Sequence, residues 1–401
     1  MTKADKEGQR KAPILRFKGF TDDWEQRQLN DIAKVYDGIH ETPNYTTCGI
    51  PFVSVENIRT LTTEKYVSKS FYEEKFKIKP QCDDILMTRI GDIGTSNVVS
   101  KIPLAYYVSL ALIRLNTGQN AYFFKYFFDS EYAQKELWSR TLHIAFPKKI
   151  NKNEIGKINI YTTCIKEENK IAQLFNKLNN LLALYERKTR LLGKLRTFLT
   201  QRLFSNSSKV SLYFDNKNWS KHKISEFLTE RNEKVVPNSS IPLVSFTVEK
   251  GVTPKSKRYN REFLVKDDNK KYKITKKDDI VYNPANLKFG AIARNKFGNA
   301  AFSPIYVTFI TKLNPAFTEF LVCRKDFINL ALKYQEGTVY ERMAVKSKDF
   351  LNLKIYLPNS SRDINHIAQI LQSLDTLVSL NKNKVSLITL IKKELLNTMF
   401  I

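Results

Sequence analysis

Long apolar runs, clustered cysteines and clustered histidines are all missing from this sequence. No stretch approaches the roughly 18 to 20 apolar residues that a bilayer-crossing helix needs, and the opening segment carries charges where a secretory signal has its apolar stretch. The cysteines and histidines are too dispersed for a disulfide framework, a CxxC zinc pair or an HExxH metal motif. They are Cys48, Cys82, Cys164 and Cys323, and His40, His143, His222 and His366. We expect a cytoplasmic protein with no membrane partner and no metal site.

Motifs that carry catalysis are also missing. The sequence has no GxxxxGK[ST] phosphate loop and no GxSxG nucleophile turn. The segment Asn283-Pro284-Ala285-Asn286 lacks the second proline and the aromatic residue of the amino-methyltransferase signature, and no glycine-rich cofactor loop accompanies it, so a turn after a strand is the better interpretation. The paired acids Asp83-Asp84 and Asp278-Asp279 precede apolar strands, which favours turn capping over acid–base catalysis. We therefore expect no catalytic residue and no bound cofactor in this chain.

Positive charge is what the chain has in excess. Lys and Arg number 66 against 40 Asp and Glu, which gives a formal net charge of +26 over 401 residues. A balance this basic favours a polyanionic partner such as nucleic acid. With 42% hydrophobic and 12% aromatic residues, the body of the chain is predicted to be globular.

The sequence repeats itself after 195 residues. Matching segments in the two predicted domains are 195 residues apart. Those in the helices that follow are 196 residues apart, because the second copy has one extra residue. The pairs are Trp24 and Trp219, Asp83-Asp84-Ile85 and Asp278-Asp279-Ile280, Ile160-Tyr161 and Ile355-Tyr356, and Ile171-Ala172-Gln173 and Ile367-Ala368-Gln369. A period this long predicts two equivalent modules and not a solenoid of short repeats.

Each copy ends in a heptad pattern typical of a coiled-coil helix. The first helix is predicted to place residues 171, 174, 178, 181, 185, 188, 192, 195 and 199 on its seam, and the second 367, 370, 374, 377, 381, 384, 388, 391 and 395. The equivalent Lys188 and Lys384 would interrupt both seams, and Tyr185 would face the slot that Asn381 fills. Two interpretations stay open for these polar positions: long side chains that reach out of the seam, or a buried polar layer that fixes register.

These patterns predict an α+β protein in which two tandem α+β domains are separated by an antiparallel two-helix coiled coil, with a pseudo-twofold internal repeat. A helix of about 39 residues is about 58 Å long, which compares with roughly 17 base pairs of DNA. The predicted boundaries are 1–23 for a polar leader, 24–165 for the first domain, 166–205 for the first helix, 206–218 for a linker, 219–361 for the second domain and 362–401 for the second helix.

Basic and amide side chains gather in the irregular parts of both domains, where they are candidates for DNA contact. Arginine reads guanine, asparagine reads adenine, and lysine mostly neutralises phosphate. The scaffold segments match between copies while these loops differ, as two readers of different half-sites would require. The candidates are Arg89, Asn97, Lys101, Lys148, Lys149, Asn151, Lys152, Lys255, Lys257, Arg258, Asn283, Asn286, Lys288, Arg294, Asn295, Lys296, Arg342, Lys346 and Lys348.

With this organisation the chain resembles a specificity subunit of a type I restriction-modification system over nearly all its length. The resemblance rests on the ordered duplication, on two heptad helices opening with Ile-Ala-Gln at 171 and 367, on Lys149-Ile150-Asn151, and on the opening and closing segments 15–25 and 392–400. It implies two target-recognition domains, each reading one half of a bipartite double-stranded DNA target, with the paired helices spanning the unread spacer. The family's base-reading residues vary between members, so no motif assigns them here.

The resemblance also implies partners that hold the chemistry. Two modification subunits that bind S-adenosylmethionine and methylate adenine are expected to dock on this chain, and ATP- and Mg²⁺-dependent restriction subunits to join them. A stand-alone DNA-binding architectural or regulatory protein is the alternative, and a neighbouring gene for an adenine methyltransferase would distinguish the two. A nuclease or methyltransferase acting by itself is disfavoured by the missing motifs.

Overall fold

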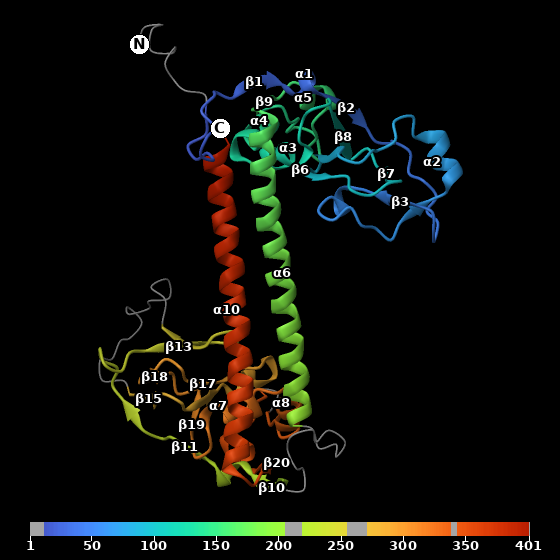
Figure 1. Ribbon diagram of the computed structural model, residues 1–401. Helices are drawn as coiled ribbons and strands as arrows, with labels where there is room; N and C mark the ends of the chain where they lie inside the picture. Colours follow the sequence, from blue (N-terminus) through green and yellow to red (C-terminus); the bar gives the residue numbers. More distant parts are fainter. Residues whose placement is uncertain (1–11, 205–218, 255–270, 338–342, 401) are drawn as a thin grey trace. The chain divides into compact units, whose positions relative to one another are not determined.

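The computed structural model describes residues 12–204, 219–254, 271–337 and 343–400. It divides into two compact units (Figure 1). Unit 1 combines residues 1–187 with 382–401, and unit 2 comprises residues 188–381. Each unit therefore contains one alpha/beta body and one half of each long helix. The boundaries predicted for the recognition domains and the linker remain predictions.

Unit 1 is built on an antiparallel four-stranded sheet in the order β2 (Ala33–Asp37), β8 (Leu110–Leu115), β5 (Ile85–Ile90), β6 (Asp92–Val98). A smaller sheet has the order β4 (Tyr66–Val67), β3 (Ile50–Val53), β7 (Ala105–Tyr106), and β1 (Glu25–Gln28) pairs with β9 (Asn159–Thr162). The short helices are α1 (Leu29–Ile32), α2 (Lys69–Lys75), α3 (Ala121–Phe128), α4 (Glu131–Ser139) and α5 (Lys152–Gly156).

Unit 2 repeats this plan. Its four-stranded sheet has the order β11 (Leu228–Glu230), β19 (Val307–Thr311), β16 (Ile280–Tyr282), β17 (Ile292–Arg294), and β10 (Trp219–Lys223) pairs with β20 (Lys354–Pro358). The other strands are β12 (Lys234–Val235), β15 (Tyr272–Thr275) and β18 (Ala300–Phe302) in one sheet, and β13 (Val244–Thr247) with β14 (Gly251–Pro254). The helices are the 3-10 helix η7 (Pro284–Phe289), then α7 (Pro315–Val322), α8 (Lys325–Leu332) and α9 (Ser347–Asn352).

The duplication predicted from the sequence is confirmed at the level of strand register. Glu25 faces Thr162 across β1 and β9, and Ser220 faces Leu357 across β10 and β20, both shifted by 195 residues. The central sheets have equivalent strand orders. The copies differ in the connection after the central strand: β5 turns directly into β6 at Gly91, which has a φ of 81°, whereas η7 stands between β16 and β17. A shared frame therefore carries different loops.

The turn role predicted for the repeated aspartates is also confirmed. Asp83 and Asp278 adopt left-handed backbone conformations, with φ of 68° and 73°, which Asp tolerates better than most residues. Next to them, Asp84 accepts a hydrogen bond from the Gln81 backbone N–H at 2.8 Å, and Asp279 accepts one from that of Lys276 at 2.7 Å. These carboxylates close the turns that lead into the central strands.

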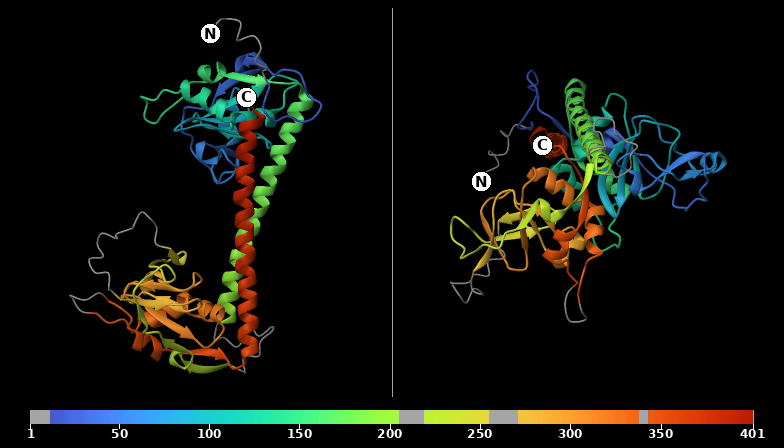
Figure 2. Two further views of the ribbon diagram at one scale, coloured as in Figure 1. Left: turned by 90° about the vertical axis from the view of Figure 1, so that its left-hand side faces the viewer. Right: turned by 90° about the horizontal axis from the view of Figure 1, so that it is seen from below.

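The two long helices, α6 (Ile165–Leu203) and α10 (Ser361–Met399), span 39 residues each. In unit 1 the first half of α6 lies beside the last part of α10 (Figure 2), where Phe175 and Phe400 share a core with Trp24. In unit 2 the last part of α6 lies with the first half of α10, and Phe204 and Leu371 share its core. The antiparallel pairing predicted for the helices agrees with both contacts.

The predicted seam is half wrong. Burial along α6 follows residues 171, 175, 178, 182, 185, 189, 192, 196, 199 and 203, and along α10 it follows 367, 371, 374, 378, 381, 385, 388, 392, 395 and 399. One of the two heptad positions was therefore predicted correctly, and the other lies one residue further along each helix. Residues 174, 181, 188 and 195, with their counterparts in α10, lie on the flank of the seam. The sequence carries two overlapping apolar stripes along each helix, and the seam uses a different combination of them from the one predicted.

With this shift, neither interpretation applies to Lys188 and Lys384, because both lysines lie outside the seam. Lys188 and Lys384 are exposed on the flank, and the Lys384 ammonium lies 5.2 Å from the centre of the Tyr185 ring. The polar seam residues are instead Tyr185 with its counterpart Asn381, Arg196 with its counterpart Lys392, and Thr189, whose counterpart is Val385. Asn381 is 4% exposed, and its side-chain amide donates to the Leu377 carbonyl at 2.6 Å.

Candidate nucleic-acid interface

In unit 1 the predicted DNA contact Arg89 turns out to be structural. Its side chain is buried on β5, where it pairs with Asp37 and donates to the Ile150 carbonyl at 3.2 Å. Burial lowers the pKa of this guanidinium from its ordinary value. Arg89 thus holds the segment around Ile150 against the central sheet through charge-assisted hydrogen bonds, and its contact with a base stays a prediction.

The segment that Arg89 holds carries four of the other candidates. Lys148, Lys149, Asn151 and Lys152 are all exposed at the start of α5. The Lys148 ammonium lies 4.4 Å from the Trp138 ring centre, and Lys152 lies 3.4 Å from Asp37. The three exposed lysines among them can accept phosphate oxygens.

The remaining two candidates of unit 1 lie elsewhere. Asn97 on β6 donates to the Ile58 and Arg59 carbonyls, both at 3.0 Å. Its amide therefore closes a loop, and its contact with DNA stays a prediction. Lys101 is exposed in the connection between β6 and β7.

Three candidates of unit 2 also have internal roles. Asn283 is 6% exposed and caps η7 by accepting from the Ala285 and Asn286 backbone N–H groups. Asn295 is 0% exposed; it donates to Thr275, Lys276 and Gly298 and accepts from Phe297 and Gly298. Arg294 lies within ion-pair distance of Asp278 and Glu319, at 3.5 and 3.2 Å. Asn283 and Asn295 thus have their hydrogen bonds satisfied inside unit 2, whereas the buried Arg294 Nε makes no hydrogen bond despite its ion-pair distance to Glu319.

The exposed candidates of unit 2 lie in η7, after β17 and around α9. They are Asn286, Lys288, Lys296, Lys346 and Lys348. Lys288 lies 5.0 Å from the centre of the Phe289 ring, while Lys296 pairs with Glu319 at 2.9 Å and Lys346 with Glu336 at 3.0 Å. Lys255, Lys257, Arg258 and Arg342 lie outside the described residues.

Sequence reasoning missed two arginines, the half-buried Arg114 and the buried Arg231, that bind the turn aspartates of the two frames. Arg114 donates two hydrogen bonds to Asp84 at 2.9 and 2.6 Å, and Arg231 donates two to Asp279 at 2.8 and 2.9 Å. These carboxylates are the repeated turn aspartates. Arg114 is on β8, whereas Arg231 follows β11, so the two arginines occupy non-equivalent positions and a search for matching residues could not pair them.

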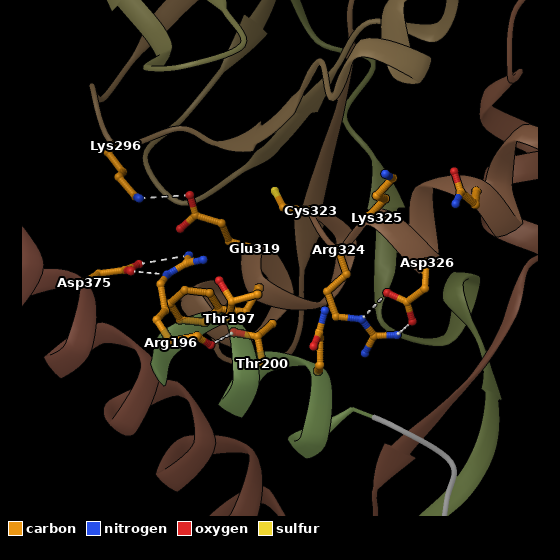
Figure 3. A pocket seen from close by; sticks show the side chains of 13 residues that line it. Arg196, Thr197, Thr200, Lys296, Glu319, Cys323, Arg324, Lys325, Asp326 and Asp375 are labelled. Carbon is orange, nitrogen blue, oxygen red and sulfur yellow. Dashed lines mark hydrogen bonds and ion pairs between the residues drawn. The ribbon is translucent and has the colours of Figure 1, made fainter. Parts of the chain in front are cut away.

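A cavity of about 720 Å³ lies in unit 2 where α6 and α10 meet α7 and α8 (Figure 3). Its walls carry three ion pairs: Arg196 with Asp375, Lys296 with Glu319, and Arg324 with Asp326. Each carboxylate lining it thus has a cationic partner. The first pair links α6 to α10, and the other two lie within the alpha/beta body of unit 2.

Two further findings concern chemistry and membranes. Within the described ranges, no three His, Cys, Asp or Glu side chains come together as a metal site would require. In the same part of the chain, no helix has the length and apolar content to cross a bilayer.

Comparison with known proteins gives one full-length relative and a full-length structural match. No family model matches the chain. The chain is 22% identical over 412 aligned residues to the putative type I restriction enzyme MjaX specificity subunit of Methanocaldococcus jannaschii, covering 94% of this chain and 92% of that protein. It superposes with a TM-score of 0.64 on the crystal structure of the type I restriction-modification system S subunit from M. genitalium, at 14% identity, covering 97% and 99% of the two chains.

The resemblance to the type I specificity subunits is confirmed. The likeness extends over both copies and both helices, because each comparison covers more than nine-tenths of both chains. The α+β fold with paired long helices is thereby the specificity-subunit fold. Within that fold, Asn286 and Lys288 lie on η7, the connection that differs between the two copies.

Proposed function

We propose that this chain is the non-catalytic DNA sequence-recognition subunit of a type I restriction-modification complex. The observation that carries the proposal is a duplicated frame with divergent loops: the strand registers repeat after 195 residues, while the connection following the central strand is a tight turn in one copy and η7 in the other. Two similar frames with different loops suit a target of two unlike halves. The full-length relatives support this function over a stand-alone regulator.

The excess positive charge fits double-stranded DNA as the partner. The exposed lysines of unit 1 at 148, 149 and 152, and those of unit 2 at 288, 296, 346 and 348, are proposed to bind phosphates. Since each neutralised phosphate releases counterions, the affinity should fall steeply with salt. The candidates that the structure buries are left out of this proposal.

The flank of each long helix supports the docking of modification subunits. A second heptad stripe places exposed leucines at Leu181, Leu184, Leu191 and Leu195 on α6, and their counterparts 196 residues later are Leu377, Leu380, Leu387 and Ile391. Exposed apolar stripes of this kind favour partner helices. Because the stripe occurs twice, we propose two modification subunits, which bind S-adenosylmethionine; ATP and Mg²⁺ belong to the restriction subunits of the same proposal.

Genome-wide mapping of methylated adenines, with and without this gene, tests the function. We expect a split motif of two short halves separated by unspecified bases, which disappears when the gene is deleted and returns with a plasmid copy. Methylation at a single uninterrupted motif would contradict the two-reader arrangement. Methylation that is unchanged by the deletion would contradict the role itself.

A further inference from the structure

The loop between α4 and α5 presents two large apolar side chains to solvent. Ile144 is 99% exposed and Phe146 is 104% exposed, and of the large apolar side chains in the described residues none is more exposed. Side chains of this kind are normally covered, so a pair of them at one loop tip marks a surface that meets a partner.

The base of this loop is held firmly. The backbone N–H of Leu142 donates to the Lys149 carbonyl at 2.8 Å, and that of Gly91 donates to the Lys148 carbonyl at 2.8 Å. The His143 ring lies 4.5 Å from the Trp138 ring, which also lies under the Lys148 ammonium. The tip is therefore presented from a fixed platform on the central sheet, and little ordering remains to be done when it meets a partner.

The surroundings of the tip are basic. Lys148, Lys149 and Lys152 are exposed beside it. The carboxylates nearby are engaged: Asp37 pairs with Arg89 and Lys152, and Glu136 and Glu154 lie 3.7 and 3.6 Å from Arg140. An apolar tip with a lysine border complements a base stack flanked by phosphates better than it complements an ordinary protein surface.

We propose that Ile144 and Phe146 form a wedge that enters a base step of the half-site bound by unit 1, while Lys148 and Lys149 neutralise the adjoining phosphates. The wedge rests on the DNA-recognition function proposed above and adds a deformation of the target to it. Apolar side chains inserted in this way partly unstack the step and kink the duplex. Specificity then includes the ease with which that step opens, since flexible steps cost less to deform. The corresponding loop of the second copy includes residues 338–342, outside the described residues, so the wedge is assigned to unit 1 alone.

Fluorescence of 2-aminopurine, which rises when the base is unstacked, tests the wedge. The full chain is assembled with its modification subunits and bound to duplexes that carry the mapped target, with 2-aminopurine at successive positions of each half. We expect a several-fold rise at one step of one half-site. Phe146→Ala and the double variant Ile144→Ala/Phe146→Ala should abolish the rise. The matched control Ile14→Ala, at an isoleucine that is 90% exposed outside the loop, should keep it.

The outcomes separate the wedge from the function on which it depends. Sequence-specific binding by the wild-type complex with no rise at any position overturns the wedge and leaves the recognition function standing. Failure of the wild-type complex to prefer the mapped target overturns the recognition function, and the wedge with it. If the Phe146 variants keep the rise but no longer co-purify with the modification subunits, the tip is a protein-docking surface and the wedge is wrong. Circular dichroism and thermal unfolding of each variant verify that it is folded.

Discussion

Two adjacent glutamates at the start of α6 have opposite pKa shifts because their hydrogen-bond partners differ. Glu167 is 0% exposed and accepts two hydrogen bonds from Arg16, at 2.8 and 2.7 Å, and further ones from Trp24 and Thr163. Burial alone would raise the pKa of Glu167, but the hydrogen bonds from Arg16 and Thr163 lower it overall. Glu168 is 1% exposed, and burial raises its pKa despite hydrogen bonds from the Asn120 backbone and the Thr162 hydroxyl. Both acids lie in the first turn of α6, where the positive end of the helix dipole favours negative charge.

The two glutamates should therefore respond oppositely to neutralisation. The folded pKa of Glu167 lies below its unfolded value, so its contribution to stability is present above about pH 4.5 and is lost as pH falls through the folded pKa. Glu167→Gln should cost about 3 kcal/mol at neutral pH, because the Arg16 charge stays behind without its partner. Urea unfolding followed by circular dichroism over a series of pH values measures the loss, which should shrink in acid.

Glu168 is the matched control for this prediction. Its folded pKa is raised, so its ionisation opposes folding once pH rises above the ordinary value. Glu168→Gln should be neutral or stabilising at neutral pH, since the Thr162 hydroxyl can reverse and accept a hydrogen bond from the new amide. If both variants lost the same stability at every pH, the opposite electrostatic environments described for them would be wrong.

Asn295 and Lys296 are a second pair of neighbours, and their substitutions should affect the unfolding free energy differently. Asn295→Ala should reduce the unfolding free energy by about 3 kcal/mol, because it leaves several buried donors and acceptors of the turn without partners. Lys296→Ala should change it by less than about 1 kcal/mol, since Lys296 is 62% exposed and its pair with Glu319 is at the surface. Thermal unfolding compares them. An Asn295→Ala protein of normal stability that recognised a changed DNA sequence would restore the base-reading role.

At the scale of elements, the sequence predicted the helices well and their seam only partly. Both long helices were predicted from heptads, since apolar periodicity is a local property that survives in any fold. The seam depends on which of two overlapping stripes meets the other helix, and that choice is made by packing between residues almost 200 positions apart. Leu371 and Ile370 illustrate it: the sequence predicted Ile370 on the seam, whereas Leu371 is buried there.

Substitution of these neighbours separates the seam from the flank. Leu371→Ala should cost about 3 kcal/mol of stability, because it leaves a cavity in the core of unit 2. Ile370→Ala should change stability by less than about 0.5 kcal/mol, since Ile370 is 41% exposed. Chemical denaturation gives both values, and the reverse order would return the seam to the predicted register. Under the proposed function, Ile370→Ala should instead weaken co-purification with the modification subunits.

Packing between distant residues also decides which candidate side chains of the site are exposed. The basic loops were found from composition, but a sequence does not tell an arginine that reaches solvent from one that reaches a buried carboxylate. Arg89 and Asn295 satisfy their hydrogen bonds with groups contributed by other loops and strands. The exposed tip with Ile144 and Phe146 was missed because a short apolar run between Arg140 and Lys148 looks like part of a core strand. Only three-dimensional burial distinguishes these cases.

For the whole molecule, the proposed function makes the two alpha/beta bodies exchangeable. Replacing residues 24–165 with the first domain of another specificity subunit should change one half of the methylated motif and leave the other half unchanged. Equivalent strand orders in the two central sheets make the frame tolerant of such a replacement. Mapping of methylated adenines reads out both halves at once. A change in both halves would show that recognition is not divided between the copies.

The length of the helices should set the number of unread base pairs between the halves. Inserting one heptad at equivalent points of α6 and α10, after Arg187 and after Asn383, keeps both seams in register and lengthens each helix by about 10 Å. That corresponds to about 3 base pairs, but it also turns the second half-site by roughly 100° around the duplex. We expect the preferred spacer to lengthen and the affinity to fall, because the DNA must be untwisted to present both halves.

Inserting three heptads provides the decisive comparison. The added length of about 31 Å corresponds to about 9 base pairs, close to one full turn of DNA. Both halves then face the same side again, so affinity should recover on duplexes whose spacer is longer by about one turn. Binding measured on a series of duplexes with stepwise longer spacers would reveal this periodicity. A preferred spacer that stays the same after both insertions would show that the helices do not measure the distance between the half-sites.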